Sequence, residues 1–137
     1  MKVVLDTNCL LVALPKKSPY HCVWQAFLYG KLRLCFSTET LQEYEEILLR
    51  NYSVSTVSLI MEMLLKSTNA VPTVPYYRWQ LISADLDDNK FVDCALNAGA
   101  ELIVSNDKHF NVLKEIDFPA IQVVDMANFK NIILNRN

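Results

Sequence analysis

Glycine is scarce in this chain. Only Gly30 and Gly99 occur among its 137 residues. A P-loop and a dinucleotide-binding turn each need several glycines within one turn, because the backbone must approach phosphate closely. The sequence therefore excludes both kinds of Gly-rich nucleotide site.

Long apolar runs and an excess of positive charge are also missing. No stretch approaches the roughly 18 consecutive apolar residues of a membrane helix, and Asp6 and Asn8 interrupt the apolar start that a secretion signal requires. Thirteen basic against fifteen acidic residues give a net charge of −2, so no overall positive field attracts nucleic acid. We expect a cytoplasmic protein with no membrane partner, in which any contact with nucleic acid is local.

Cysteine pairs with metal-binding spacing are absent as well. The chain has four cysteines but no C-x2-C pair, and we expect them to be reduced thiols. Apolar residues make up 52% of the sequence and charged residues 20%, a composition typical of a globular core rather than of disorder. The length predicts a single domain over residues 1–137.

Strand-like and helix-like segments alternate along the chain. We expect strands over 2–6, 32–36, 102–104 and 120–124, and an edge strand over 71–75, where two prolines exclude a sheet interior. We expect helices over 9–14, 20–29, 38–51, 55–66, 88–97, 110–116 and 126–134. This alternation predicts an α/β domain with a parallel sheet covered on both faces.

Polar residues follow two of the expected strands. Asp6-Thr7-Asn8 ends the first strand and Ser105-Asn106-Asp107 ends strand 102–104. Both segments should meet at the carboxyl edge of the sheet, where α/β domains bind ligands. On helix 38–51, Glu43 and Glu45 lie at the two borders of the apolar stripe, so helical geometry alone does not choose between them.

A further acid opens the helix over 88–97. Asp88 precedes Phe91 by three residues and Ala95 by seven, which places it on the buried side at the helix mouth. Asp93 points away from that stripe. Each acid alone could simply cap a helix. Several carboxylates in one crevice, however, repel one another unless a divalent cation compensates their charge. Oxygen ligands of this kind suit Mg²⁺ or Mn²⁺.

These acids stand in motifs that resemble the PIN domain family, and most of all its VapC-like bacterial subgroup of toxin components of toxin–antitoxin systems. Asp6-Thr7-Asn8 is similar to the family's first motif, and Ser105-Asn106-Asp107 is similar to its last. Between them, the helical S-x-x-x-L-x-E pattern selects Glu43 over Glu45, and the D-x-D-D-x-K-F signature places the third acid on Asp88. The resemblance runs from residue 1 to about 129.

The resemblance implies a PIN-like three-layer α/β/α sandwich with about five parallel strands in the order 3-2-1-4-5. It also implies a metal-dependent endoribonuclease that cleaves single-stranded RNA. The catalytic and metal-binding residues would be Asp6, Glu43, Asp88 and Asp107, with Mg²⁺ or Mn²⁺ as the cofactor. The partners would be the RNA, an antitoxin protein and, as a further assembly, a second copy in a homodimer.

Other residues would support this site. Three could orient the carboxylates or water from behind: Asn8, Ser105 and Asp93. Four lysines could contact phosphates, or could simply be solvated surface charges: Lys16, Lys17, Lys90 and Lys108. For the antitoxin we expect a docking surface around Tyr20, Trp24 and the helix face over 57–65, because aromatic and methionine side chains favour interfaces.

Two other functions fit parts of the pattern. A catalytically silent PIN-like interaction module would be favoured by the loss of one acid, but all four are present. A haloacid-dehalogenase-like phosphatase also places an aspartate after its first strand. That chemistry requires D-x-D, and Asn8 occupies the position of the second acid.

Overall fold

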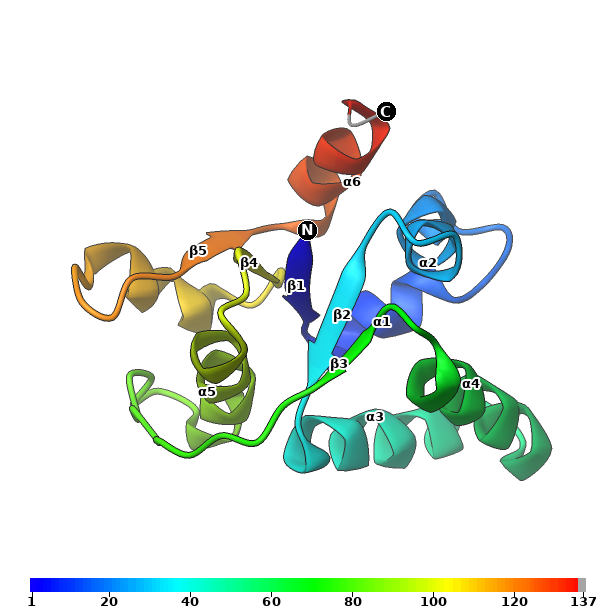
Figure 1. Cartoon of the computed structure of the whole chain (residues 1–137), viewed down its shortest axis with the longest axis horizontal. Helices are drawn as coiled ribbons and strands as arrows, with labels where there is room; N and C mark the ends of the chain where they lie inside the picture. Colours follow the sequence, from blue (N-terminus) through cyan, green and yellow to red (C-terminus); the bar gives the residue numbers. More distant parts are fainter. Residues whose placement is uncertain (136–137) are drawn as a thin grey trace.

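A five-stranded parallel sheet forms the centre of the molecule (Figure 1). The computed structural model describes residues 1–135. The strands are β1 (Lys2–Leu5), β2 (Arg33–Phe36), β3 (Ala70–Pro72), β4 (Leu102–Val104) and β5 (Gln122–Val124). Their order is β3-β2-β1-β4-β5, which confirms the predicted topology. The edge strand expected over 71–75 is shorter and begins one residue earlier.

Helices fill the connections between the strands. They are α1 (Thr7–Ala13), α2 (His21–Leu28), α3 (Thr38–Asn51), α4 (Val54–Lys66), α5 (Asn89–Ala98) and α6 (Met126–Asn135). Two further segments are 3₁₀ helices, η1 (Leu86–Asp88) and η2 (Lys108–Glu115). The short helix expected over 110–116 is therefore the 3₁₀ helix η2, which begins directly after Asp107. None of the helices within residues 1–135 is long and apolar enough to cross a membrane.

The central strand carries the most buried sequence. Val3, Val4 and Leu5 are between 0 and 2% exposed, because helices cover both faces of a parallel sheet. Figure 1 shows α5 on one side of the sheet and α1, α2 and α4 on the other. Burial of each large apolar side chain contributes about 2 kcal/mol, so the sheet and its layers form a rigid support for the residues that follow each strand.

Two backbone hydrogen bonds continue the ladder beyond the strands. The N–H of Asp6 donates to the carbonyl of Val104 at 3.0 Å, and the N–H of Ser105 donates to that of Val124 at 2.9 Å. Strands β1 and β4 are parallel and in register, with Leu5 beside Val104. The first residues after both strands therefore lie next to each other at the carboxyl edge of the sheet.

Specific cap residues fix the start of α3 and the end of α5. The side chain of Ser37 accepts the N–H of Thr40, and the Thr40 hydroxyl receives the N–H of Ser37, which makes a capping box at the start of α3. Gly99 ends α5 with φ +67°, a left-handed conformation that favours glycine. These caps set the register of α3 and α5, and so the positions of their acids.

The docking surface predicted for a partner is partly wrong. Trp24 is 5% exposed and packs on Phe27, with ring centroids 5.3 Å apart. On α4 the apolar side chains divide, with Val57 and Leu64 in the core and others, including Met63, exposed. Trp24 is therefore a core residue. Tyr20 is half-buried and carries Lys130 Nζ 5.9 Å from its ring centroid, so the exposed side of α4 is the larger part of the predicted surface that stays open to a partner.

Candidate active site

Asp6, Ser105 and Asp107 form one hydrogen-bonded unit at the carboxyl edge of the sheet. The Ser105 hydroxyl donates to Asp6 Oδ2 at 2.6 Å and accepts the N–H of Asp107 at 3.0 Å. Asp6 also accepts the backbone N–H of Asn8 at 2.9 Å, as the cap of α1. Ser105 thus fixes two of the predicted acids at once, whereas Asn8 orients Asp6 through its backbone and its own side chain is exposed.

Glu43 reaches the same edge from α3. Its carboxylate accepts a hydrogen bond from the Thr7 hydroxyl and pairs with Lys90 Nζ at 2.8 Å. The side chains of Glu43 and Lys90 are only 24% and 18% exposed, while Glu45 is exposed to solvent. The inward direction of Glu43 is therefore the one that the sequence motif predicted, and Lys90 is held inside the site rather than on an open surface.

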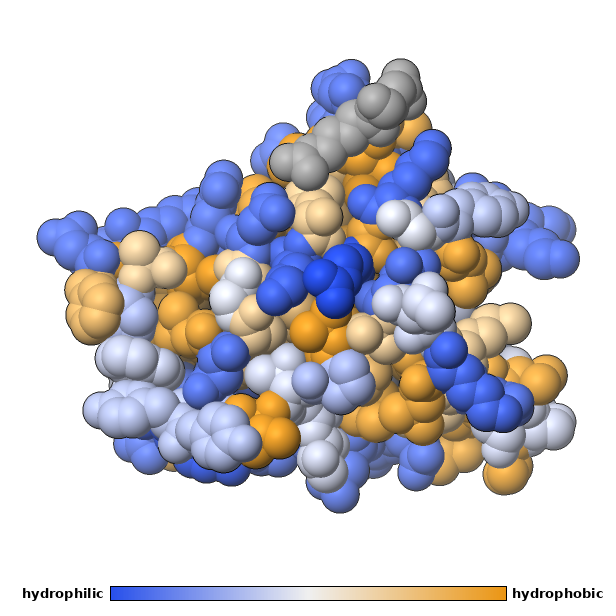
Figure 2. Space-filling view, in the orientation of Figure 1, coloured by the Kyte–Doolittle hydropathy of each residue, from blue (hydrophilic) through white to orange (hydrophobic). Residues whose placement is uncertain are grey.

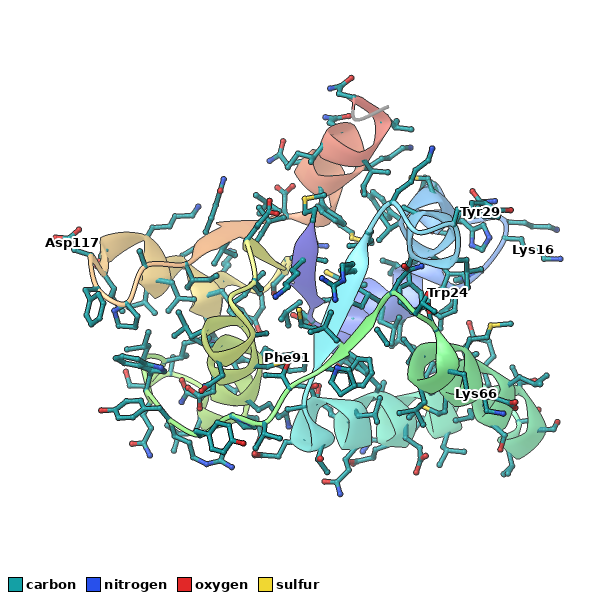
Figure 3. All side chains as sticks on the ribbon, in the orientation of Figure 1. Lys16, Trp24, Tyr29, Lys66, Phe91 and Asp117 are labelled. Carbon is teal, nitrogen blue, oxygen red and sulfur yellow. The ribbon has the colours of Figure 1, made fainter. Side chains whose placement is uncertain are left out.

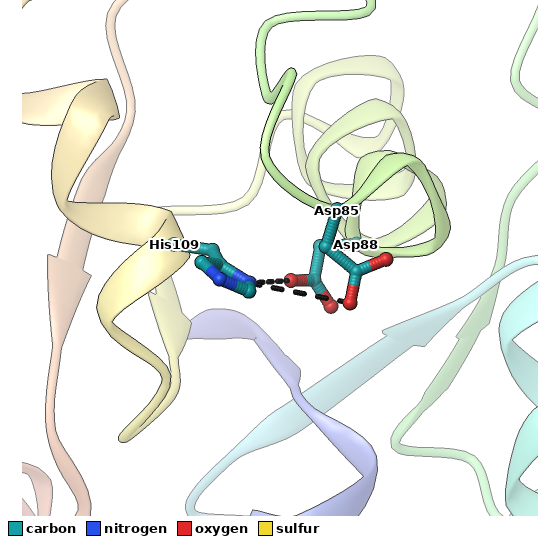
Figure 4. A group of neighbouring side chains, drawn as sticks. All are labelled: Asp85, Asp88 and His109. Atoms are coloured by element: carbon teal, nitrogen blue, oxygen red, sulfur yellow. Dashed lines mark hydrogen bonds and ion pairs between the residues drawn. The ribbon is translucent and has the colours of Figure 1, made fainter.

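Asp88 stands at the junction of η1 and α5, beside His109 at the start of η2 (Figure 4). His109 Nδ1 lies 3.4 Å from Asp88 Oδ2, 3.4 Å from Asp107 Oδ1 and 4.0 Å from Asp85 Oδ2. One ligand atom each from Asp85, Asp88 and His109 lies within 4.8 Å of the others, a grouping that could hold a metal ion. Within residues 1–135, the four predicted acids do not form so tight a group among themselves.

Burial and neighbouring carboxylates raise the pKa of two acids at this edge, Asp6 and Asp88. Burial raises the pKa of Asp6, with smaller contributions from the charges of Asp107 and Glu43. Burial and repulsion from Asp107 and Asp85 raise the pKa of Asp88 to about 7. Among residues 1–135, one ion pair with a lysine, that of Lys90 with Glu43, compensates the charges of Asp6, Glu43, Asp85, Asp88 and Asp107, so the site is an incompletely compensated negative centre.

Asp93 does not belong to this centre. It is 3% exposed, and its Oδ1 accepts the N–H of Trp79 at 2.9 Å. Asn89 and Asn97, one turn away on either side of α5, bind backbone groups of residues 77–82 in the same manner. The three side chains hold this extended segment against the helix, so Asp93 has a structural contact where we expected a group behind the metal ligands.

The predicted lysines separate into three places. Lys90 pairs with Glu43, and Lys108 is exposed immediately after Asp107. Lys16 and Lys17 lie on the loop after α1, and Figure 3 places Lys16 at the opposite side of the molecule from α5. Only Lys90 and Lys108 are therefore close to the acidic centre.

Three members of the site escaped the sequence reasoning in their observed roles: Thr7, Lys90 and His109. Thr7 is 4% exposed and directs Glu43. Its position between Asp6 and Asn8 in the first motif was a usable signal. The pairing of Lys90 with Glu43 has no local signal, because α3 and α5 meet only in the folded chain.

The donor set fits a hard divalent cation. Asp6, Asp88 and Asp107 offer carboxylate oxygens around a negative centre, and Mg²⁺ and Mn²⁺ prefer such ligands. His109 adds one nitrogen, which Mn²⁺ accepts more readily than Mg²⁺. A cation here would offset the repulsion from Asp107 and Asp85 that adds to the effect of burial on the pKa of Asp88.

Comparison with solved structures shows the same fold. A chain of VapBC2 from Rickettsia felis, bound to a DNA fragment from their promoter, is 15% identical, with 91% of this chain and 98% of that chain covered and a TM-score of 0.62. VapBC-1 from nontypeable Haemophilus influenzae is 17% identical, with 93% and 99% covered and a TM-score of 0.60. FitAB bound to the IR36 DNA fragment is 12% identical, with 90% and 94% covered and a TM-score of 0.57.

The curated proteins contain no match to this sequence. A model of the PIN domain matches residues 2–109, a span that holds β1 to β4, all four predicted acids and His109. The haloacid-dehalogenase-like interpretation is therefore wrong. The chain belongs to the PIN domain family.

Proposed function

We propose that this protein is a metal-dependent endoribonuclease that cleaves single-stranded RNA and acts in the cytoplasm as the toxin of a toxin–antitoxin pair. The observation that carries the proposal is the partly buried acidic centre of Asp6, Asp88 and Asp107, with Glu43 beside it. Carboxylates with so little compensation are costly to a fold unless they bind a cation. Membership of the PIN domain family supports nuclease chemistry at this centre.

The metal would be held by the carboxylates of Asp6, Asp88 and Asp107, with Glu43 as the fourth acid. When bound, Mg²⁺ or Mn²⁺ would supply a Lewis acid for the scissile phosphate and lower the pKa of a water ligand. Ser105 keeps Asp6 oriented by its 2.6 Å hydrogen bond, and such support typically changes activity by about 10- to 100-fold.

The remaining residues handle charge around the phosphate. Lys90 Nζ, 2.8 Å from Glu43, holds a positive charge at the α3 side of the centre. His109 Nδ1 lies on the η2 side, 3.4 Å from both Asp88 Oδ2 and Asp107 Oδ1. A phosphodiester bound at the carboxylates would therefore meet the ammonium group of Lys90 and the ring of His109.

The toxin role rests on the fold of the solved relatives. The structures of VapBC2 and VapBC-1 match at least 91% of this chain, which supports an antitoxin as the partner here. Leu59 and Met63, one turn apart on α4, are 60% and 47% exposed and support docking of another chain, whether an antitoxin or a second copy. Exposed apolar groups that adjoin one another are a common feature of such interfaces.

The cleavage proposal is tested with purified protein and a fluorogenic, unstructured RNA, with a duplex of the same sequence as comparison. We expect cleavage of the single strand with Mg²⁺ or Mn²⁺ and none with EDTA. Asp88→Asn should lower kcat by at least about 100-fold, and Asp87→Asn, an exposed neighbour with the same loss of charge, should not. Equal cleavage with EDTA, or equal effects of the two variants, would contradict the proposal.

The toxin role needs a test in cells. We expect the wild-type chain to arrest bacterial growth on expression, Asp88→Asn to be harmless, and co-expression of the adjacent gene to restore growth. Harmless expression of an active wild-type nuclease would contradict the toxin role alone. A wild-type protein without metal-dependent cleavage would favour the silent interaction module instead.

A further inference from the structure

The 3₁₀ geometry of η2 arranges its side chains in three straight rows. A 3₁₀ helix has three residues per turn, so residues at positions i and i+3 eclipse one another. One row, with Phe110 and Leu113, is 0 and 2% exposed and packs into the core. A second row begins with His109, which faces Asp88. The third row is exposed, and we call it the η2 ladder: Lys108, Asn111 and Lys114.

The η2 ladder forms one wall of a groove beside the candidate active site. The groove has a volume of about 450 Å³, and its opposite wall comes from β5 and the start of α6, including Asn128. Ser105 and Asp107 are also among its lining residues, so the groove adjoins the acidic centre. Figure 2 shows hydrophilic side chains gathered at the upper left of the molecule, over β5 and η2.

The cations of the ladder are not used within the fold. Among residues 1–135, neither Lys108 nor Lys114 has an ion pair or side-chain hydrogen bond, whereas Lys66 and Lys90 pair with glutamates. Asp125 on the opposite wall accepts the N–H of Asn128 at its Oδ1 at 2.8 Å, and neither Asp125 nor Asp107 pairs with either lysine of the ladder among the described residues. The groove therefore presents the ammonium groups of Lys108 and Lys114 alongside these two carboxylates.

We propose that the η2 ladder binds the sugar–phosphate backbone of single-stranded RNA on one side of the cleaved bond. This inference rests on the proposed function. Each turn of a 3₁₀ helix rises about 6 Å, which is close to the separation of neighbouring phosphates along a strand. Lys108 and Lys114 then contact two phosphates that flank a third beside Asn111.

Two features favour RNA over an acidic protein segment. The cationic and amide groups repeat at one fixed interval, as phosphates do along a strand, while acidic side chains in a peptide have no such fixed spacing. The row also starts at Lys108, the residue after Asp107, so a strand that follows the ladder is led into the carboxylates. Contacts to phosphate position a strand without reading its sequence, so the ladder should act equally on all sequences.

The test measures binding separately from cleavage. A labelled single-stranded RNA of ten nucleotides is titrated with the full-length Asp88→Asn protein in Mn²⁺ by fluorescence anisotropy, at several salt concentrations. Lys108→Gln and Lys114→Gln are compared with Lys31→Gln, an exposed lysine ahead of β2 at the opposite edge of the sheet. All three variants remove one exposed positive charge, so the fold should be equally preserved.

Each ladder variant should lower the slope of log K against log salt by about 0.7, the value for one phosphate contact on a single strand, and so weaken binding about fivefold at 0.1 M salt. Lys31→Gln should leave the salt slope and the affinity unchanged. When the RNA is shortened from the end that lies away from the carboxylates, the effect of Lys114→Gln on binding should disappear before that of Lys108→Gln. These effects should be the same for RNAs of different sequence.

The inference is overturned if the ladder variants behave like Lys31→Gln, if the RNA does not bind, or if an acidic peptide of equal charge binds with the same dependence on both lysines. Wild-type protein tested for cleavage in parallel separates the two proposals. If wild-type protein cleaves RNA and the ladder variants cleave it equally well, only the proposed role of the η2 ladder is contradicted. If RNA binding depends on the ladder but no RNA is cleaved, the proposed nuclease activity is contradicted and RNA binding by the ladder is supported.

Discussion

Repulsion within the acidic centre should make the metal-free protein less stable than a variant that lacks one charge. Asp88 is the best position for the test, because its side chain is 14% exposed and burial, Asp107 and Asp85 raise its pKa from 3.8 to about 7. A difference of this size corresponds to about 4 kcal/mol between the ionised and neutral forms. Asp88→Asn removes the charge but no helix cap, since Asp88 makes no side-chain cap bond to α5.

The direction of the effect with pH follows from the raised pKa. Above pH 7 the folded wild type carries the unfavourable charge, so Asp88→Asn should be more stable by up to about 4 kcal/mol. As the pH falls from 7 to 4, folded wild type takes up the proton before the unfolded chain does, and the difference should vanish. Salt screens part of the repulsion, so we expect the melting temperature at pH 8 to rise by about 5 to 10 °C.

Thermal unfolding followed by circular dichroism in EDTA measures this difference at pH 8, 6 and 4.5. Asp87→Asn is the matched control, because Asp87 is exposed and one residue away, and its melting temperature should follow that of wild type. Addition of Mn²⁺ at pH 8 should stabilise wild type more than Asp88→Asn and narrow the gap. A variant that melts at or below the wild-type temperature at pH 8 would refute the claim of repulsion.

Three further variants separate supporting contacts from structural ones. Thr7→Val removes the hydroxyl that donates to Glu43. We expect kcat to fall by about 10-fold and the free energy of unfolding, measured in urea, to fall by about 1 kcal/mol. An unchanged kcat would contradict the role of Thr7 in orienting Glu43. Ser105→Ala removes the hydrogen bond that lowers the pKa of Asp6, so the acidic limb of the pH–rate profile should move to higher pH, and an unmoved limb would count against it. Asp93→Ala leaves the backbone N–H of Trp79 unpaired and should lower the free energy of unfolding by about 1 to 3 kcal/mol. The affinity for Mn²⁺ should stay unchanged. A tenfold loss of that affinity would show that Asp93 supports the metal ligands after all.

Local patterns in the sequence were enough to predict the parallel sheet and the polar residues that follow its strands. The apolar run before Asp6 and the one before Ser105 each predict a buried strand, and parallel strands bring their carboxyl ends together. Ser37 at the start of α3 and Gly99 at the end of α5 are of the residue types that favour helix caps. These features depend on residues within a few positions of one another.

Contacts between distant elements could not be read in the same way. The periodicity of α5 correctly turns Asp93 away from the apolar stripe, but the side away from the stripe is covered by residues 77–82 rather than by water. Trp24 was expected at the surface, and α2 buries it. The row of Lys108, Asn111 and Lys114 depends on a 3₁₀ rather than an α-helical period, which an apolar pattern of so few residues does not distinguish.

The central claim is that the carboxylates at the sheet edge bind a divalent cation and that this cation is required for RNA cleavage. Free Mn²⁺ followed by electron paramagnetic resonance, together with the initial rate of RNA cleavage in the same samples, tests both parts at once. We predict that bound Mn²⁺ and the cleavage rate rise together in wild type, and that both are lost in Asp88→Asn. Cleavage at full rate without bound Mn²⁺, or tight binding of Mn²⁺ with no cleavage of any single-stranded RNA, would contradict the account.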